Sequence, residues 1–164
     1  MMSAGNGAMY GNIQGIKNLM SHYDKDGDYI NPVNGLAGLL VTDENESSRK
    51  RIISIPDSSK EEMYELTKKE FLRENGVHNG DTTKRTDVYN NLYRKMSKKD
   101  RLAAGYTLEK YERIYRQAFY DAAKKADPNW EIGKPIKDGA LDSVTRETAE
   151  SGKSPAQATL DTKI

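Results

Sequence analysis

A single apolar stripe dominates this sequence. Between residues 108 and 126, apolar side chains recur every three or four positions, and the pattern ends at Asp127-Pro128. The spacing places these side chains on one face of an α-helix of about five turns. The stripe consists of Leu108, Tyr111, Ile114, Tyr115, Ala118, Phe119 and Ala122. Such a face is stable only when other elements cover it, so the sequence predicts helices packed on helices.

The segment 58–74 has the sharpest helix boundaries. Two serines at its start each precede a glutamate by three residues, which is the spacing of a capping box. These pairs are Ser58 with Glu61 and Ser59 with Glu62. Asn75-Gly76 follows and supplies the left-handed residues that commonly end a helix. We therefore predict a helix over residues 58–74 that depends on its two caps.

Further helices are predicted from weaker patterns. Apolar spacing indicates helices at 10–23 and 87–96. A short helix over 97–104 is expected to end at Gly105, and Thr107 is then expected to cap the long helix. The chain thus contains four or five predicted helices.

Two short apolar runs, 36–41 and 51–55, fit either a β-hairpin or one or two helical turns. The predicted fold class is therefore mainly α, a small domain of four to five helices with or without one short β-hairpin. We expect residues 1–9 to be a flexible N-terminus, 10–132 to be the helical domain, and 133–164 to be an extended or disordered tail.

The composition limits the size of the core. Hydrophobic residues make up 35% of the 164 residues, whereas charged residues make up 31%. Tyrosine rings or a partner are therefore expected to complete a small core. The longest apolar run, 36–41, is far too short to span a membrane, so no membrane partner is expected. The chain lacks a recognisable signal peptide, which predicts a cytoplasmic protein.

One acidic loop is a candidate metal site. Asp24, Asp26 and Asp28 occupy alternate positions, as do the first three ligands of a calcium loop. However, Tyr29 stands where that loop requires glycine, and Gly35 stands where it requires a bidentate glutamate. We interpret the segment as an Asp/Gly turn that binds no metal, with calcium binding as the weaker alternative.

Catalytic chemistry finds little support. The chain has no cysteine and only two histidines, His22 and His78, which lie far apart. It contains none of the nucleophile, phosphate-binding or dinucleotide-binding motifs. We therefore predict no cofactor and favour a protein that is not an enzyme.

The segment 81–126 carries the strongest signal for an interaction. It holds twelve basic and six acidic residues, although the net charge of the whole chain is +1, and it holds six of the ten tyrosines. Arginine and tyrosine are the side chains that protein interfaces and single-stranded nucleic-acid grooves use. The predicted partner-binding residues are Arg94, Lys98, Lys99, Arg113, Tyr115, Arg116 and Tyr120.

We therefore expect a non-enzymatic protein-interaction or regulatory module that binds another protein with an acidic surface. The first alternative is a nucleic-acid-binding protein that uses the same basic helical surface. The second is an enzyme or effector whose active site has no recognisable motif.

Overall fold

The computed structural model describes residues 22–78 and 82–157 of the chain. These residues form a mainly α domain, so the predicted fold class is confirmed. The helices are α2 (Glu46–Arg49), α3 (Asp57–Arg73), α4 (Thr82–Arg94), α5 (Arg101–Ala126) and α6 (Arg146–Glu150), with 3-10 turns η1 (Lys98–Asp100) and η2 (Pro155–Gln157). The expected flexible N-terminus and nearly all of the helix expected at 10–23 lie outside the described residues.

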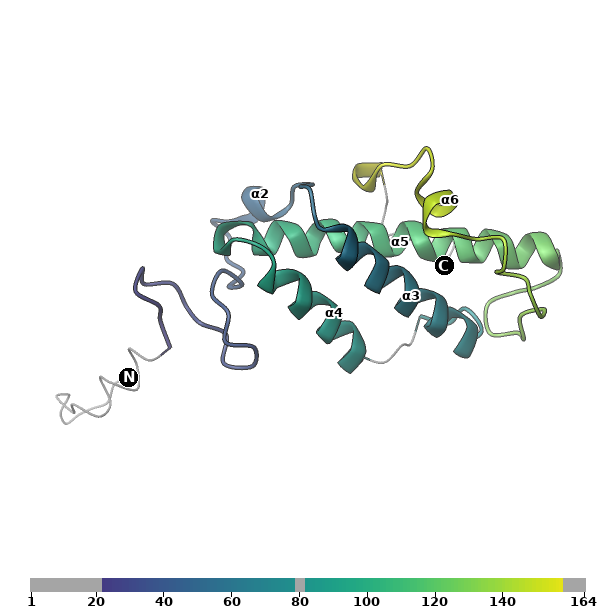
Figure 1. The fold of residues 1–164 in the computed structure, drawn as a ribbon, viewed down its shortest axis with the longest axis horizontal. Helices are drawn as coiled ribbons and strands as arrows, with labels where there is room; N and C mark the ends of the chain where they lie inside the picture. The colour runs from purple at the N-terminus through teal and green to yellow at the C-terminus, as the bar shows by residue number, and fades with distance from the viewer. Residues whose placement is uncertain (1–21, 79–81, 158–164) are drawn as a thin grey trace.

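Helix α5 is the axis of the fold. It runs along the length of the molecule, with α3 and α4 side by side against it (Figure 1). The apolar faces of the three helices are fully buried against one another, with Met63 and Phe71 from α3, Leu92 from α4, and Leu108 and Phe119 from α5. The apolar stripe predicted over residues 108–126 is therefore the face of α5 that the other helices cover.

Aromatic rings fill much of the core, as the low apolar content requires. Phe71 contacts both Phe119 and Trp130, with ring centroids 5.8 and 6.0 Å apart. Tyr64 lies 5.5 Å from Phe119, centroid to centroid, and donates its hydroxyl to the Val144 carbonyl oxygen at 2.8 Å. Rings of this size bury enough area to close a core with few aliphatic residues.

The start of α3 corrects the predicted capping mechanism. Pro56 occupies the N-cap position, with φ −61° and ψ 141°, and no side chain caps the helix. Ser58 Oγ instead accepts a hydrogen bond from Lys95 Nζ at 2.8 Å. Ser59 is fully buried, and its hydroxyl has no hydrogen-bond partner. The helix therefore begins where predicted, but without the serine caps.

The end of α3 follows the prediction. Asn75 and Gly76 have φ values of 53° and 85°, and the Gly76 amide donates to the Phe71 carbonyl oxygen at 2.8 Å. This is the hydrogen bond of a Schellman ending. A Cβ atom at residue 76 would lie 2.9 Å from Trp130, so the close approach of the indole also favours glycine.

The long helix begins earlier than predicted. Gly105 does not end a helix but lies inside α5, where a Cβ atom would come within 2.8 Å of the Tyr93 hydroxyl. Thr107 is not a cap either: its hydroxyl donates to the Ala103 carbonyl oxygen at 2.9 Å and accepts from the Ile53 amide at 3.0 Å. The close approach of Tyr93 on α4 to α5 thus explains why residue 105 is glycine, whereas the sequence indicated a helix end there.

The apolar runs 36–41 and 51–55 do not pair as a hairpin. In the described residues, the strand-like pairing consists of isolated bridges, Tyr23 with Tyr29 and Ile30 with Ala37. Ile55 is buried in the core and Ile53 is packed against it, because this segment runs across α5 instead of along another strand.

The segment after residue 132 contributes to the same core. Residues 133–145 run without helix or strand, and α6 follows. Nevertheless, Leu141, Val144 and Ala149 are buried in the cluster that the long helices form. The sequence placed these aliphatic residues in a tail beyond the helical domain, because they are too widely spaced to form an amphipathic stripe of their own.

Candidate interaction surface

Two residues predicted to contact a partner, Tyr115 and Arg116, lie in the core instead. The Tyr115 hydroxyl donates to Glu150 Oε2 at 2.6 Å, and burial together with this carboxylate raises the pKa of Tyr115. Arg116 Nη2 donates to the Gly76 carbonyl oxygen at 2.9 Å, and its guanidinium lies 5.6 Å from the centroid of the Phe71 ring. Neither side chain can belong to a binding surface of the folded chain, so the prediction that these two residues contact a partner is wrong.

Three more predicted residues are engaged within the chain. Arg113 Nη2 pairs with Glu109 Oε2 one helical turn away, at 3.3 Å. The Tyr120 ring packs edge-on against Trp130, with centroids 5.7 Å apart. Lys98 is surrounded by carboxylates, as described below. Carboxylates of the chain itself, from α5 and from the acidic loop, therefore use the charges of Arg113 and Lys98 that the sequence assigned to a partner.

The remaining two predicted residues, Arg94 and Lys99, stay exposed. Arg94 Nη1 makes a hydrogen bond of 3.2 Å to Asn91 Oδ1 on the same helix. Of the seven predicted residues, the two that stay exposed thus lie near the junction of α4 and α5, and the other five do not form an exposed basic surface along the long helix.

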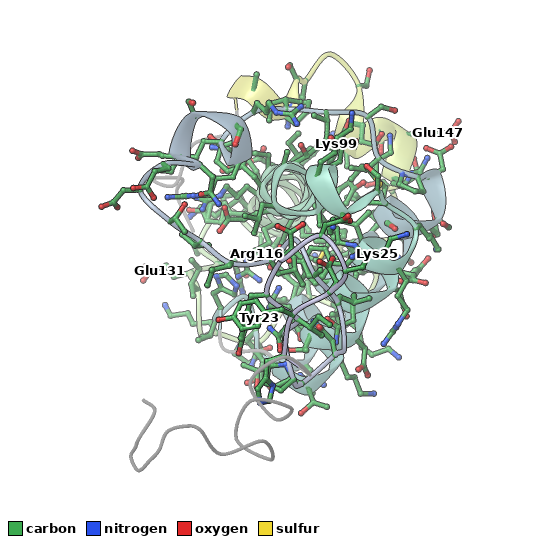
Figure 2. All side chains as sticks on the ribbon, turned by 90° about the vertical axis from the view of Figure 1, so that its left-hand side faces the viewer. Tyr23, Lys25, Lys99, Arg116, Glu131 and Glu147 are labelled. Atoms are coloured by element: carbon green, nitrogen blue, oxygen red, sulfur yellow. The ribbon has the colours of Figure 1, made fainter. Side chains whose placement is uncertain are left out.

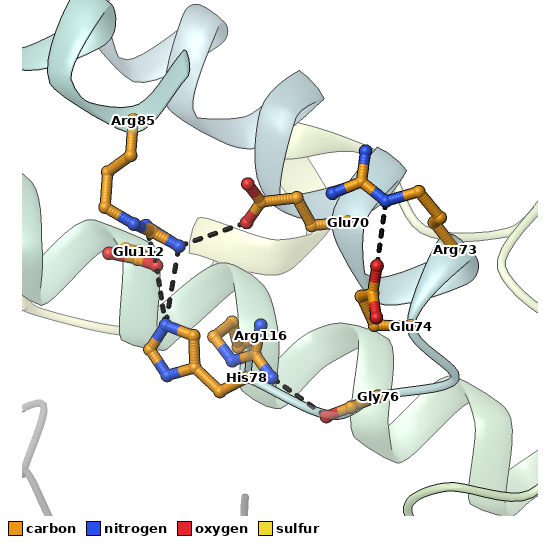
Figure 3. A network of polar contacts seen from close by, with 8 residues as sticks. All are labelled: Glu70, Arg73, Glu74, Gly76, His78, Arg85, Glu112 and Arg116. Carbon is orange, nitrogen blue, oxygen red and sulfur yellow. Dashed lines mark hydrogen bonds and ion pairs between the residues drawn. The ribbon is translucent and has the colours of Figure 1, made fainter. Parts of the chain in front are cut away.

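A buried charge network joins α3, α4 and α5 (Figure 3). Arg85 on α4 lies between Glu70 on α3 and Glu112 on α5. Its Nη2 lies 3.0 Å from Glu70 Oε1, and its Nη1 pairs with Glu112 Oε2. His78, from the segment after α3, places Nε2 3.4 Å from Glu112 Oε2. We define Glu70, Arg85 and Glu112 as the buried network; the His78 side chain, which is 55% exposed, contacts it from the solvent side.

The charges of the buried network largely compensate one another. Burial raises the pKa of Glu112, but the hydrogen bond with His78 and the charges of Arg85 and Arg116 outweigh burial and lower it overall. One carboxylate oxygen of Glu70 is buried without a hydrogen-bond partner. Because the arginine is already bound to both carboxylates, the network is suited to holding helices together. Sequence reasoning missed it, although Glu112 lies on the apolar stripe, four residues after Leu108.

The acidic loop holds a cation supplied by the chain itself. Lys98 Nζ lies 2.7, 2.8 and 2.6 Å from the Oδ2 atoms of Asp24, Asp26 and Asp28. These carboxylates converge, since each has an oxygen within 4.8 Å of the others. Lys98 lowers the pKa of Asp24, and the aspartates in turn raise the pKa of Lys98. The position that a calcium ion would take in this loop is thus occupied by an ammonium group.

A groove lies beside this loop, between residues 23–49 and the start of α5. It has a volume of about 470 Å³. Its apolar lining comes from Tyr23, Tyr29, Leu40, Leu102 and Ala103, and its basic lining comes from Arg49, Lys98 and Lys99. Figure 2 looks at this end of the molecule, with Tyr23 on the loops in the lower half and Lys99 above. We call this hollow the N-terminal groove.

The segment that lines one side of this groove is rich in exposed apolar side chains, and two of them, Tyr23 and Leu40, line the groove itself. The described residues expose eight large apolar side chains, and five of them lie between residues 23 and 52. These five are Tyr23, Val33, Leu40, Val41 and Ile52. Sequence reasoning assigned Leu40 and Val41 to a hairpin strand or a helix, because an apolar run of this length is usually buried.

A second hollow, of about 750 Å³, lies between α3 and residues 142–147. Its lining is strongly acidic, with Asp57, Glu61, Glu65, Asp142 and Glu147 facing Lys68 and Arg146. Arg146 spans this acidic groove, with its guanidinium nitrogens 3.4 Å from Asp57 Oδ1 and 3.9 Å from Glu61 Oε1. Burial and the neighbouring Glu65 raise the pKa of Glu61. An internal arginine therefore already neutralises part of this surface.

Fold and surface together define a small, mainly α protein with an apolar groove at one end. Over residues 1–164, the chain matches the model of a family described as a domain of unknown function (DUF3879), and it belongs to that family. No curated protein and no solved structure matches the chain. Among the described residues, no helix is long and apolar enough to cross a membrane.

Proposed function

We propose that this protein is a non-enzymatic interaction module that binds a partner protein in the N-terminal groove. The bound segment of the partner carries an aromatic or aliphatic anchor flanked by acidic residues. The exposed side chains of Tyr23 and Leu40 in the wall of a largely apolar hollow carry this proposal, because exposed apolar patches commonly mark protein interaction sites.

The charge of the groove supports an acidic partner. Arg49 and Lys99 line the hollow, whereas Asp28, which also lines it, is paired with Lys98. Basic side chains around an apolar floor favour carboxylates beside the anchor, and they accelerate association more than they prolong the complex. The acidic groove is the less suitable surface, because Arg146 already spans it.

Selection from a displayed library of random peptides tests this proposal. We expect the selected peptides to combine a large apolar residue with neighbouring Asp or Glu. Leu40→Asp should weaken their binding at least about tenfold, since a buried leucine side chain contributes about 1.5–3 kcal/mol. Leu72→Asp is the matched control, because both leucines are exposed, Leu40 to 55% and Leu72 to 46%, but Leu72 lies on α3. Selection of basic peptides, or equal loss in both variants, would contradict the proposal.

Nucleic-acid binding is the alternative function, and it would rest on Arg94 and Lys99. It predicts that the affinity for a single-stranded oligonucleotide falls steeply and linearly with salt on a logarithmic scale. An oligonucleotide that binds the wild type but not an Arg94→Glu/Lys99→Glu variant would favour this alternative over the peptide groove.

A further inference from the structure

Lys98 lies at the edge of the N-terminal groove and contacts two other parts of the chain, the acidic loop and the loop that contains Gly38. Its ammonium contacts the acidic loop, and its side chain also lines the groove. The Lys98 backbone lies directly against the loop that contains Gly38. A Cβ atom at Gly38, where φ is 84°, would come within 2.2 Å of the Lys98 carbonyl oxygen. The lysine therefore touches both loops that form the outer wall of the groove.

The acidic loop sets the position of two groove residues. Tyr23 and Tyr29 flank it, form an isolated bridge and pack edge-on, with ring centroids 6.0 Å apart. Inside the loop, Asp24 Oδ1 accepts hydrogen bonds of 2.9 Å from the amides of Asp26 and Asp28. The other oxygen of Asp24 binds Lys98. Lys98 is thus linked to Tyr23 and Tyr29 through Asp24, because the same carboxylate binds the lysine and the backbone of the loop between the two tyrosines.

We propose that Lys98 is the positioning residue of the N-terminal groove, because its ammonium supplies the cation that Asp24, Asp26 and Asp28 need in order to converge. Without a cation, three carboxylates this close repel one another, so the loop opens and the wall formed by Tyr23 and Tyr29 is lost. This inference rests on the proposed function only in treating the groove as the binding site.

The charges around the ammonium support this assignment. The aspartates face Lys98 from the loop, and their hydrogen bonds raise the pKa of the lysine. The neighbouring Lys99 is exposed and lines the same groove, but no ion pair of the described residues involves it. The two adjacent lysines thus have different roles: Lys98 holds the loop, whereas Lys99 faces the groove.

Hydrogen exchange on the full-length chain tests the inference without any partner. The informative amides are those of Asp24, Asp28 and Ile30, which donate within the loop to Asp28 O, Asp24 Oδ1 and His22 O. In Lys98→Met we expect these amides to exchange at least tenfold faster, while the amides of α5 keep their wild-type rates. Lys98→Arg should restore most of the protection, because a guanidinium can also bind the three carboxylates. Lys99→Met, the matched control, should leave all rates unchanged.

A second measurement separates this inference from the proposed function. Peptides selected on the wild type should bind Lys98→Met at least tenfold more weakly, and Lys98→Arg with nearly wild-type affinity. If no acidic, apolar peptide is selected, the proposed function fails, but accelerated exchange in Lys98→Met still supports the positioning role. If the loop amides exchange equally fast in Lys98→Met and the wild type, the positioning role is overturned, whatever the peptides do.

Discussion

Arg85 and Lys98 each hold carboxylates from distant parts of the chain, but they do so in opposite surroundings. In the buried network, the side chains of Glu70 and Glu112 are only 2% and 7% exposed. In the acidic loop, the side chains of Asp26 and Asp28 are 60% and 51% exposed. The same kind of contact therefore has different consequences in the two places.

Burial decides what the loss of each cation would do. Water and salt screen the charges of the exposed loop, so an ion pair there contributes little to global stability and acts mainly on the local conformation. Two carboxylates left without a counterion between helices cannot be solvated in this way. Arg85 is thus expected to stabilise the whole fold, whereas Lys98 is expected to shape one surface.

The largest expected effect is on the buried network. Arg85→Met should lower the free energy of unfolding by about 3 kcal/mol, because it removes the cation that Glu70 and Glu112 share in the core. Denaturant unfolding measures this loss. Arg94→Met, at an exposed arginine of the same helix, is the control and should change stability by no more than about 0.5 kcal/mol. Equal stability of the two variants would show that the network is not buried in solution.

The pH dependence of stability should differ between the two regions. The folded chain lowers the pKa of Glu112 below its ordinary value of 4.5, so this residue stabilises the fold above pH 4.5. That contribution is lost as the pH falls through the lower pKa of the folded state. Unfolding midpoints measured down to about pH 3 should therefore fall less steeply in Glu112→Gln than in the wild type.

Asp24→Asn is the surface counterpart for this pH series. In the wild type, Lys98 and the loop amides also lower the pKa of Asp24, so this substitution should change the pH profile in the same direction as Glu112→Gln. Because the acidic loop is exposed, this variant should flatten the pH profile less than Glu112→Gln does. Equal flattening would contradict the contrast between the two regions.

A smaller effect is expected at a buried polar group that has no partner. Ser59→Ala removes a buried, unpaired hydroxyl from α3, so the free energy of unfolding should stay constant or rise by up to about 1 kcal/mol. Ser58→Ala, at an exposed position, serves as the control. If each substitution instead cost about 1 kcal/mol, the two serines would be acting as helix caps in solution.

Calcium should have the smallest effect. In the wild type, millimolar calcium should leave the melting temperature unchanged, because Lys98 already occupies the centre of the acidic loop. In Lys98→Met, calcium should raise the melting temperature slightly, since carboxylate oxygens are its preferred ligands. A calcium-dependent shift in the wild type that Asp26→Ala abolishes would show that the ion displaces the lysine.

The helices were predictable because their signals are local. The stripe over 108–126 and the ending at Asn75-Gly76 depend on spacing and on backbone preference, which are properties of short segments. The start of α5 was not predictable, because Gly105 reads as a helix end until Tyr93 is known to pack against it. The core position of Leu141 depends in the same way on the core cluster that distant parts of the chain form.

The interaction surface was less predictable, because charge placement in sequence does not show charge pairing in space. Lys98 is separated from Asp24 by more than seventy positions, yet the two form an ion pair. Arg116 lies beside the apolar stripe, and its burial depends on the carbonyl group of Gly76 at the end of another helix. The N-terminal groove likewise combines side chains from residues 23–45, α2, η1 and α5, and no local pattern indicates such a combination.

The most direct test of the account is to locate peptide binding on the chain itself. An NMR titration of the isotope-labelled, full-length protein with a selected acidic, apolar peptide would show which backbone amides respond. We predict the largest shifts around Tyr29, Leu40 and Leu102, which line the N-terminal groove. Shifts centred instead on α3 and residues 142–147, which line the acidic groove, would contradict the account.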